Sequence, residues 1–199
     1  MFYRPENGHG LPHNPWNAIV APRPIGWIST RGRLGDNLAP YSFFNATAYV
    51  PPQVMFASTG VKPDRPGTKD SVAQIAESRV FCVNIADGPL KDAVNASSAA
   101  LPAGTSEFEA AGVTPLGCET IDCLRVAEAA ASLECRMTRI IRQAGDANHI
   151  VLGVVTGIHL RDDCLVDGRF DLSRTGWLAR MGYRDYAVVT ELFEMERPA

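Results

Sequence analysis

The sequence predicts a mainly β protein, built as a largely antiparallel barrel with a few peripheral helices. The clearest strand is predicted over residues 132–140. There, Leu133, Cys135 and Met137 alternate with polar neighbours, with the two-residue period of a half-buried sheet. Residues 150–160 are rich in β-branched side chains and include two glycines, which indicate a bend or bulge of the kind that closes a small barrel. Strands and helices do not alternate regularly, which disfavours a doubly wound parallel sheet.

Further strands are predicted before and after these two. Residues 18–30 are β-rich and are followed by the turn-forming residues 31–36, so two strands joined by a loop fit this part of the chain. The short apolar runs 54–58 and 80–86 are bounded by Pro, Gly or Asp, which suits buried strands. A last strand is predicted over residues 186–192.

Helices are predicted to be few and short. Ser71 and Gln74 form a capping box that opens a helix to about residue 78, with Asp70 an equally good cap. The inner stripe of this helix would be Val72, Ile75 and Ala76. A helix of about two turns is expected from residue 106 to the stop signal at residue 112. Residues 89–100 and 172–181 carry weaker helical signals.

Composition favours one folded domain over residues 1–199, with residues 1–17 as an irregular lead-in rich in Pro, Gly, Asn and His. The net charge of -3 offers no basic footprint for nucleic acid. No window is long enough to span a bilayer, and the N-terminus lacks the apolar stretch of a signal peptide. We therefore expect a cytoplasmic protein that binds neither nucleic acid nor membrane.

Common chemical motifs are missing. The five cysteines include no C-x-x-C pair and fit no common zinc spacing, so no metal site is expected. The sequence contains neither G-x-G-x-x-G nor G-x-S-x-G, and residues 60–69 resemble a P-loop only superficially because their glycines are too far apart. Rossmann, Walker and hydrolase sites are therefore not supported.

An anion site is the first positive indication. Ser58 and Thr59 end an apolar run, and residues 68–71 open a helix whose free N–H groups and positive dipole end favour a phosphate. Lys69 would add a point charge. The alternative is an ordinary capped helix start beside a solvated lysine.

Two neighbouring segments combine aromatic and short polar side chains. Residues 23–30 read R-P-I-G-W-I-S-T, and residues 37–46 read N-L-A-P-Y-S-F-F-N-A. Such a mixture supplies apolar walls for the faces of a planar heterocycle and polar groups for its edge. The alternative is that these aromatic residues belong to the core.

Here the sequence resembles the flavin reductase-like family, the FMN-binding split barrels. The resemblance is carried by R-P-I-G-W-I-S-T, N-L-A-P-Y-S-F-F-N-A, P-P-Q-V-M-F-A-S (residues 51–58) and K-D-S-x-x-x-I (residues 69–75). Later segments, over residues 81–86, 95–115 and 178–186, are similar to a branch that includes flavoredoxin and the reductase components of two-component monooxygenases. The motifs occur in the same order over most of the chain.

The resemblance implies a homodimeric, antiparallel, Greek-key-like split β-barrel with FMN near the subunit interface. The isoalloxazine and ribityl chain would be lined by Trp27, Ile28, Ser29, Thr30, Tyr41, Ser42, Phe43, Asn45 and Ala46. The phosphate end would lie near Ser58, Lys69, Asp70 and Ser71. Arg180 is a further phosphate or partner-subunit candidate, with an exposed, solvated arginine as the alternative.

His149 is the candidate catalytic residue. Many flavin reductases have Gly-Asp-His before the corresponding strand, with the histidine near the nicotinamide, whereas here two residues separate Gly145-Asp146 from His149. A structural histidine at a strand mouth is the alternative.

The resemblance implies an NAD(P)H-dependent FMN reductase. The nicotinamide, from NADH or NADPH as co-substrate, would pass a hydride to FMN, and the electrons would go on to free flavin, a monooxygenase or another redox protein. One alternative is a flavoredoxin-like electron carrier, and another is a non-catalytic FMN-binding module.

Overall fold

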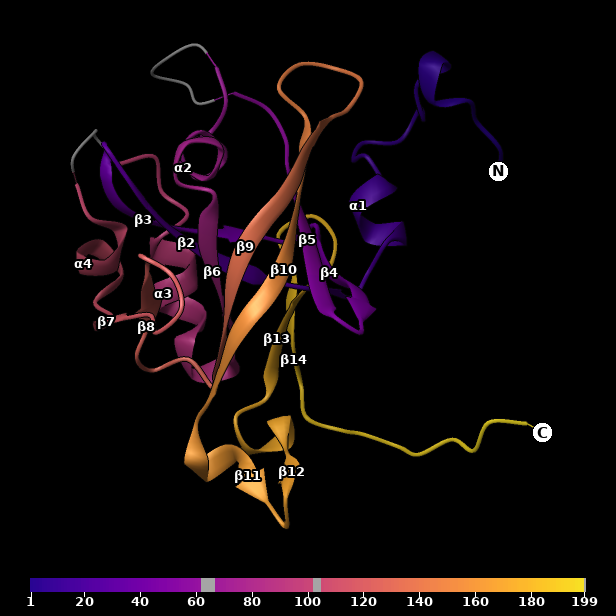
Figure 1. Cartoon of the computed structure of the whole chain (residues 1–199). Coiled ribbons are helices and arrows are strands. Elements are labelled where there is room, and N and C mark those ends of the chain that lie inside the picture. Colours follow the sequence, from indigo (N-terminus) through magenta and orange to yellow (C-terminus); the bar gives the residue numbers. More distant parts are fainter. Residues whose placement is uncertain (62–66, 102–104, 199) are drawn as a thin grey trace.

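The computed structural model describes residues 1–61, 67–101 and 105–198 of the 199-residue chain. Parts of the P-loop-like segment 60–69 and of the family segment 95–115 lie outside these residues. The main sheet is antiparallel, with the strand order β3-β2-β6-β9-β10-β5-β4. Its strands are β2 (Gly26–Gly32), β3 (Gly35–Tyr41), β4 (Phe44–Tyr49), β5 (Pro52–Ser58), β6 (Val80–Ile85), β9 (Ala131–Arg142) and β10 (His149–Leu160). The sheet curls into a barrel in which β3, at one edge, approaches β5 near the other (Figure 1).

The two longest strands, β9 and β10, bend at the expected glycines. Their register shifts between Leu152 and Gly153, and again between Val155 and Gly157. A Cβ on Gly153 would lie 2.6 Å from Cζ of Phe81, in the barrel interior, so this position requires glycine. The bend predicted from the sequence is thus confirmed, and a close aromatic contact accounts for one of the two glycines.

The remaining strands form small sheets outside the barrel. A three-stranded sheet has the order β1-β13-β14. The two hairpins pair β7 with β8 and β11 with β12. Bounds are β1 (Arg23–Pro24), β7 (Pro115–Gly117), β8 (Leu124–Val126), β11 (Leu165–Val166), β12 (Arg169–Phe170), β13 (Trp177–Arg180) and β14 (Tyr186–Val189). The helix predicted over residues 172–181 is therefore wrong, because only the short 3-10 turn Leu172–Arg174 precedes β13, which pairs with strands on both sides.

Helices cover the outside and one end of the barrel. They are α1 (Trp16–Ile19), α2 (Asp70–Ser78), α3 (Lys91–Ala96) and α4 (Glu107–Ala111), with further 3-10 turns at Pro5–Asn7, Gly88–Leu90 and Asp162–Cys164. The helices expected over residues 71–78 and 106–112 are present, while the signal over residues 89–100 gives a 3-10 turn and α3 only. Residues Ala18 and Ile19, which were predicted to be β-rich, lie in α1.

The start of α2 differs from the predicted capping box. Its N-cap is Lys69, which makes no side-chain cap hydrogen bond, and Asp70 is already the first helical residue. Val72 and Ile75 are buried as expected, but Ala76 is exposed. The Ser71 side chain is buried and turned to other partners, described below, and this tertiary bonding explains why it does not act as a cap.

Strand β2 separates two apolar cores. Ile28 contributes to the barrel interior with Phe56, Phe81 and Val151. Trp27, on the opposite face, belongs to an outer core that includes residues of α3, α4 and β8. Because both faces of β2 are covered, its residues 26–30 are all buried.

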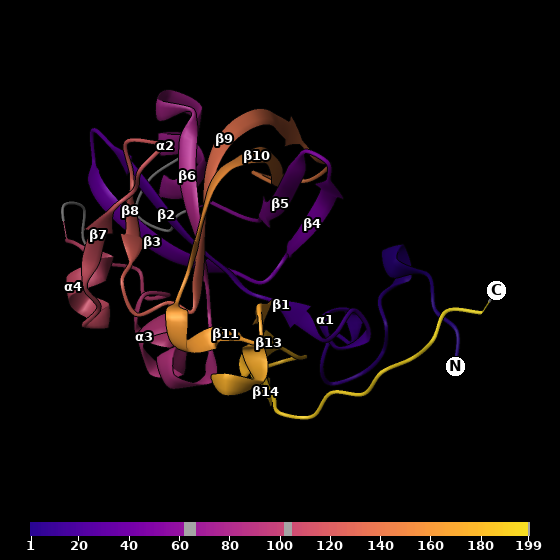
Figure 2. The same ribbon diagram turned by 60° about the horizontal axis from the view of Figure 1, so that its bottom comes forward.

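Both ends of the chain extend away from the barrel on the side of β4 (Figure 2). These segments leave large apolar side chains exposed, among them Phe2, Trp16, Ile19, Leu192 and Phe193. No helix in the described ranges has the length and apolar character needed to cross a membrane.

Candidate functional site

A cavity of 430 Å³, called here the helix-start cavity, opens where α2 begins. Its polar lining comprises Asn37, Tyr41, Lys69, Asp70, Ser71, Ser97, Ser98 and Glu107. Ala39 and Pro40 of β3 and residues 99–101 after α3 supply the rest of the wall together with Val61. The cavity therefore joins four segments that are far apart in the sequence: β3, the start of α2, the end of α3 and the start of α4.

Three hydroxyl groups meet beside the helix-start cavity, and two of them, those of Tyr41 and Ser71, belong to residues that line it. The phenol of Tyr41 forms hydrogen bonds with the hydroxyls of Ser71 and Ser58. Burial raises the pKa of Tyr41, and these two hydrogen bonds oppose that rise. Tyr41 thus stays a neutral donor and acceptor that links the end of β5 to the first turn of α2.

A buried amide fixes the position of Ser71. Nδ2 of Asn37 donates to Oγ of Ser71 at 2.9 Å and to Oγ1 of Thr30 at 3.2 Å. The Thr30 hydroxyl in turn lies 2.5 Å from Oε1 of Gln74, one turn further along α2. This network ties α2 to β2 and β3, so the helix start is held rigidly at the cavity.

Charges of both signs face the helix-start cavity. Nζ of Lys69 lies 5.9 Å from the centre of the Tyr41 ring, and Asp70 and Glu107 bring two carboxylates. The α2 N-terminus contributes its positive dipole end, and Lys69 offers no side-chain cap to the first-turn amides. An anionic group is therefore favoured on the Lys69 side, and hydrogen-bond donors are favoured beside the carboxylates.

His149 lies next to the same hydroxyl group cluster. It begins β10 and pairs with Ser58 of β5, so the two side chains share a face of the sheet, with their Cα atoms about 5 Å apart. Nδ1 of His149 is buried and has no hydrogen-bond partner in the described part of the chain. A buried, unpaired ring nitrogen at the mouth of a barrel is a candidate for contacting a ligand.

Four of the predicted ligand-lining residues do not reach the helix-start cavity. Trp27, Ile28, Ser29 and Thr30 are at most 1% exposed. Their polar atoms are used within the chain: Nε1 of Trp27 donates to Oγ of Ser97 at 2.8 Å, and the Ser29 hydroxyl donates to the carbonyl of Leu124 at 2.6 Å. The structure places these side chains behind the site, where they support residues that line it.

A second group of predicted residues lies at the edge of the barrel. Ser42 and Phe43 connect β3 to β4, and Asn45 and Ala46 are exposed on β4. Arg23 stacks over the Phe43 ring at 5.6 Å. These residues line no part of the helix-start cavity.

Arg180 lies beside Arg23 in the paired strands β13 and β1, whereas a helix-like segment was expected. Its guanidinium stacks 4.4 Å from the centre of the Tyr186 ring and donates to the carbonyl of Tyr183. Burial and the charge of Arg180 lower the pKa of Arg23. Two guanidinium groups side by side, bonded to carbonyls, mark this edge as electropositive.

Several residues of the helix-start cavity were absent from the predicted site, among them Asn37 and Glu107. Asn37 stands at the start of a quoted family segment, but only the fold shows that its amide reaches Ser71. Glu107 is the first residue of α4, and no local pattern connects it with Tyr41. Asn37 belongs to one of the segments that resemble the family, and this was the only signal that could have found it, whereas Glu107 carried no signal.

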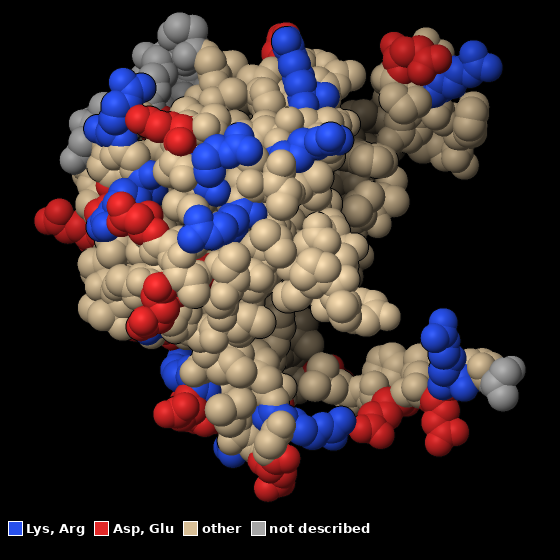
Figure 3. Space-filling view, viewed as in Figure 1, with Lys and Arg blue, Asp and Glu red and all other residues tan. Residues whose placement is uncertain are grey.

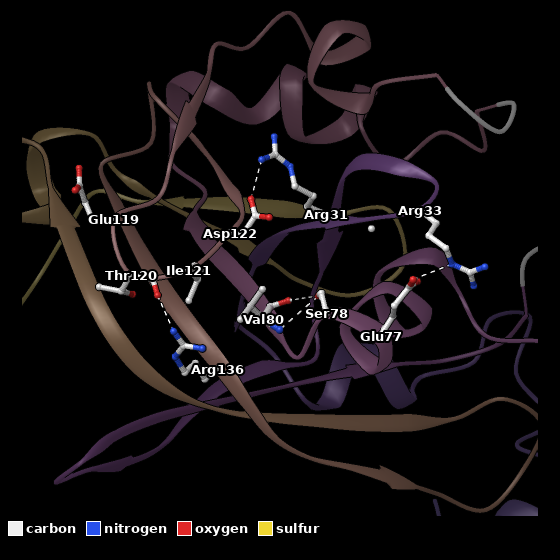
Figure 4. Close-up of a pocket in the computed structure, with 11 residues that line it drawn as sticks. Arg31, Arg33, Glu77, Ser78, Val80, Glu119, Thr120, Ile121, Asp122 and Arg136 are labelled. Carbon is white, nitrogen blue, oxygen red and sulfur yellow. Dashed lines mark hydrogen bonds and ion pairs between the residues drawn. The ribbon is translucent and has the colours of Figure 1, made fainter.

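A larger hollow of 940 Å³ lies at the C-terminal end of α2, between the β2–β3 hairpin and the β7–β8 loop (Figure 4). Its arginines are engaged by the chain itself. Arg31 pairs with Asp122 at 3.0 Å, Arg33 pairs with Glu77 at 2.8 Å, and Arg136 donates to the carbonyl of Thr120 at 2.8 Å. The helix-start cavity, which combines a helix N-terminus, a lysine and clustered hydroxyls, is the better candidate for ligand binding.

Comparisons with known proteins agree with this architecture. A family model described as "Flavin reductase like domain" matches residues 20–172. An uncharacterized protein of Deinococcus radiodurans is 36% identical over 190 residues, covering 90% of this chain and 82% of that protein.

Two solved structures extend the likeness to the whole fold. Component B of nitrilotriacetate monooxygenase from Bacillus cereus is 28% identical with a TM-score of 0.83, covering 94% of this chain and 100% of that one. The 2-nitrobenzoate 2-nitroreductase of Pseudomonas fluorescens is 27% identical with a TM-score of 0.79, covering 92% of this chain and 88% of that one. The predicted antiparallel split barrel is confirmed.

Proposed function

The chain belongs to the flavin reductase like domain family, and we propose that it is an FMN-binding, NAD(P)H-dependent flavin reductase. Membership of this family supports a flavin-dependent oxidoreductase and confirms the resemblance noted in the sequence. The observation that carries the proposal is the helix-start cavity, where Tyr41, Ser58 and Ser71 meet at the uncapped start of α2.

The residues around the helix-start cavity fit FMN. Its volume lies within the range of about 300–1,000 Å³ that is typical of small-molecule sites. Lys69, Ser71 and the α2 N-terminus would hold the phosphate, because they supply a positive charge, a hydroxyl and backbone donors. Asp70 and Glu107 would accept hydrogen bonds from the ribityl hydroxyls, and Pro40 with Tyr41 would offer apolar surface to the ring.

FMN, when bound, supplies the chemistry of accepting a hydride from a reduced nicotinamide and releasing electrons to an acceptor. The protein then needs only to bind FMN and the nicotinamide and to orient them toward each other. It does not need an acid or base of its own for this reaction. Tyr41 stays neutral because burial raises its pKa, so it holds its proton and donates or accepts hydrogen bonds. Asn37 and Thr30 keep Ser71 in place behind it.

NAD(P)H is proposed as the electron donor because a basic, open face leads to the same barrel mouth. Strand β9 exposes Arg139 and Arg142 in its second half, and Figure 3 shows basic side chains gathered on the face that carries β9. Arg142 pairs with His149 in the sheet. An anionic dinucleotide would be attracted along this face, and the unpaired Nδ1 of His149 would meet the nicotinamide.

We further propose a homodimer in which FMN lies near the subunit interface. Apart from the buried residues 27–30, most predicted site residues of this chain fall into two groups, one at the helix-start cavity and one at the exposed edge formed by β4, Phe43 and Arg180. The edge group, with its electropositive Arg23–Arg180 pair, would complete the site of a second copy. A redox protein such as a monooxygenase, or free flavin, would then receive the electrons.

The decisive experiment uses the purified protein loaded with FMN and freed of excess flavin. Adding NADH or NADPH without air should bleach the yellow flavin absorbance, and repeated turnover should follow when free FMN is supplied. Arg142→Gln should lower kcat/KM for the nicotinamide by about tenfold without changing FMN binding, because it removes one charge from the approach. Arg33→Gln, on the far hollow, serves as the matched control.

Each result of this experiment is informative. Tight FMN binding without bleaching would favour an electron carrier or a non-catalytic FMN-binding module over a reductase. A lack of FMN affinity at micromolar concentrations would refute the flavin site itself. Equal effects of Arg142→Gln and Arg33→Gln would contradict the proposed route along β9.

A further inference from the structure

A third cavity, of 480 Å³, lies at the other end of β10 and is called here the β8–β10 cavity. Arg125 of β8, Ala127 and Ala129 of the connection to β9, and residues 158–162 form its wall with Leu116 of β7. His159 is separated from His149 by ten residues of strand, which corresponds to about 30 Å. This cavity is therefore distinct from the helix-start cavity.

A fully buried carboxylate holds the histidine of the β8–β10 cavity. Oε1 of Glu134 lies 2.5 Å from Nε2 of His159. Glu134 also accepts hydrogen bonds from the amides of Glu119 and Thr120, at 2.7 and 2.6 Å, and from the Thr120 hydroxyl. Gly157 faces this carboxylate so closely that a Cβ would lie 3.3 Å from it.

These hydrogen bonds keep the Glu134 carboxylate ionised. Burial alone would raise the pKa of Glu134, but the hydrogen bonds from His159, Thr120 and the two amides outweigh it and lower the pKa to about 2. An ionised carboxylate only accepts, so Nε2 of His159 carries the hydrogen atom. The imidazole is thus fixed in orientation, as in sites where a carboxylate positions a functional histidine.

Arg125 supplies a positive charge that forms no ion pair with the residues that the structure describes. Its Nε is buried and has no hydrogen-bond partner among the described residues. Arg161, by contrast, donates to Asp163 at 2.6 Å and to the carbonyl of Glu128 at 2.8 Å, so its charge is already engaged. Asp162 also borders the cavity but is exposed to solvent.

The rim of the β8–β10 cavity is apolar. Leu116, Ile158 and Leu160 are 41%, 56% and 41% exposed, which is high for side chains of this kind. A ligand with an apolar body would cover them, and its carboxylate would match the planar fork of the guanidinium with two parallel hydrogen bonds.

We propose that the β8–β10 cavity is a second ligand site, which binds a small organic carboxylate through Arg125 and the Glu134-fixed His159. The apolar part of the ligand would rest on Leu116, Ile158 and Leu160. This inference does not depend on the flavin site, since the two cavities share no residue.

Benzoate is the probe, and calorimetric titration of the purified protein, with and without FMN, is the measurement. Saturable 1:1 binding of benzoate is expected, with benzamide, its uncharged analogue, at least about tenfold weaker because it lacks the charge. Arg125→Gln should weaken benzoate about tenfold or more, Arg125→Lys should weaken it less, and Arg33→Gln should leave it unchanged. Benzoate should also shift the NMR signals of the His159 ring, with the wild-type circular dichroism spectrum as the test of folding for each variant.

Several results would overturn the proposal. These are no benzoate binding at millimolar concentrations, benzamide binding as tightly as benzoate, or a folded Arg125→Gln variant with unchanged affinity. Inorganic phosphate is the competitor that tests ligand class. If it displaced benzoate with equal affinity, the cavity would be a general anion site, and the carboxylate assignment would be wrong.

Discussion

At the scale of single residues, the helix-start cavity depends on side chains whose roles are set by their partners. Ser71 was predicted as a helix cap and as a phosphate contact; the structure removes the first role, because its hydroxyl is held by Asn37 and Tyr41. Lys69 becomes the N-cap residue instead, with its ammonium group near the Tyr41 ring. The pair Lys69 and Ser71 therefore remains the most specific candidate for holding a phosphate.

Replacing this pair tests the placement of FMN. Lys69→Ala with Ser71→Ala should weaken FMN by about 10- to 100-fold and riboflavin by about threefold or less, because charge-assisted contacts to the phosphate are lost. Fluorescence titration with both flavins measures the difference. Lys91→Ala, on the exposed start of α3, should change neither affinity. Equal losses for FMN and riboflavin would show that the phosphate lies elsewhere.

At the scale of elements, the two ends of α2 are shaped by different causes: the cavity at its start and the backbone conformation of one residue at its end. Its start is adapted to the cavity, without a side-chain cap. Its end is strained, because the C-cap Arg79 adopts a left-handed conformation with φ of 66°, which an L side chain disfavours. Helix α4 ends on Gly112 with the same φ of 66° and no such strain.

These two helix ends form a matched pair of substitutions. Arg79→Gly should raise the free energy of unfolding by about 0.5–1 kcal/mol, because glycine adopts the left-handed conformation without strain. Gly112→Ala should lower it by a similar amount, since a Cβ there meets no atom within 4 Å and only the backbone conformation changes. Urea unfolding of both variants measures the effect, and a destabilised Arg79→Gly would contradict the assignment of strain.

At the scale of the whole molecule, the most conspicuous feature is apolar surface on the two chain ends. Trp16 is 59% exposed and Ile19 67%, and both belong to α1, which lies on the same side of the barrel as β4, where the second group of site residues is found. A monomer would leave this surface in water. A second copy of the chain would cover it and bring the edge group to a neighbouring cavity.

Sedimentation equilibrium tests the proposed dimer. The wild-type protein should have twice the 21.5 kDa mass of one chain. Trp16→Ser with Ile19→Ser should weaken association and FMN binding together, because both depend on the same interface. Leu34→Ser, an exposed apolar residue on the β2–β3 hairpin, is the control. A monomeric wild-type protein that still binds FMN would refute the shared site.

The sequence by itself determined the barrel class, its long strands and its family, because alternating and β-branched runs report local burial. The expectation of a strand was wrong for residues 18–19, which lie in α1. The expectation of a helix was wrong for residues 172–181, because the pairing of β13 with distant strands outweighs the local helical preference. Only the tertiary structure decided which predicted site residues face a cavity. Trp27 and Ser29 lie on a strand covered on both faces, while Glu107, from a distant helix, reaches the site. A sequence pattern can identify residues that could bind a ligand. Whether their face of a strand or helix is accessible depends on which distant segments pack against it.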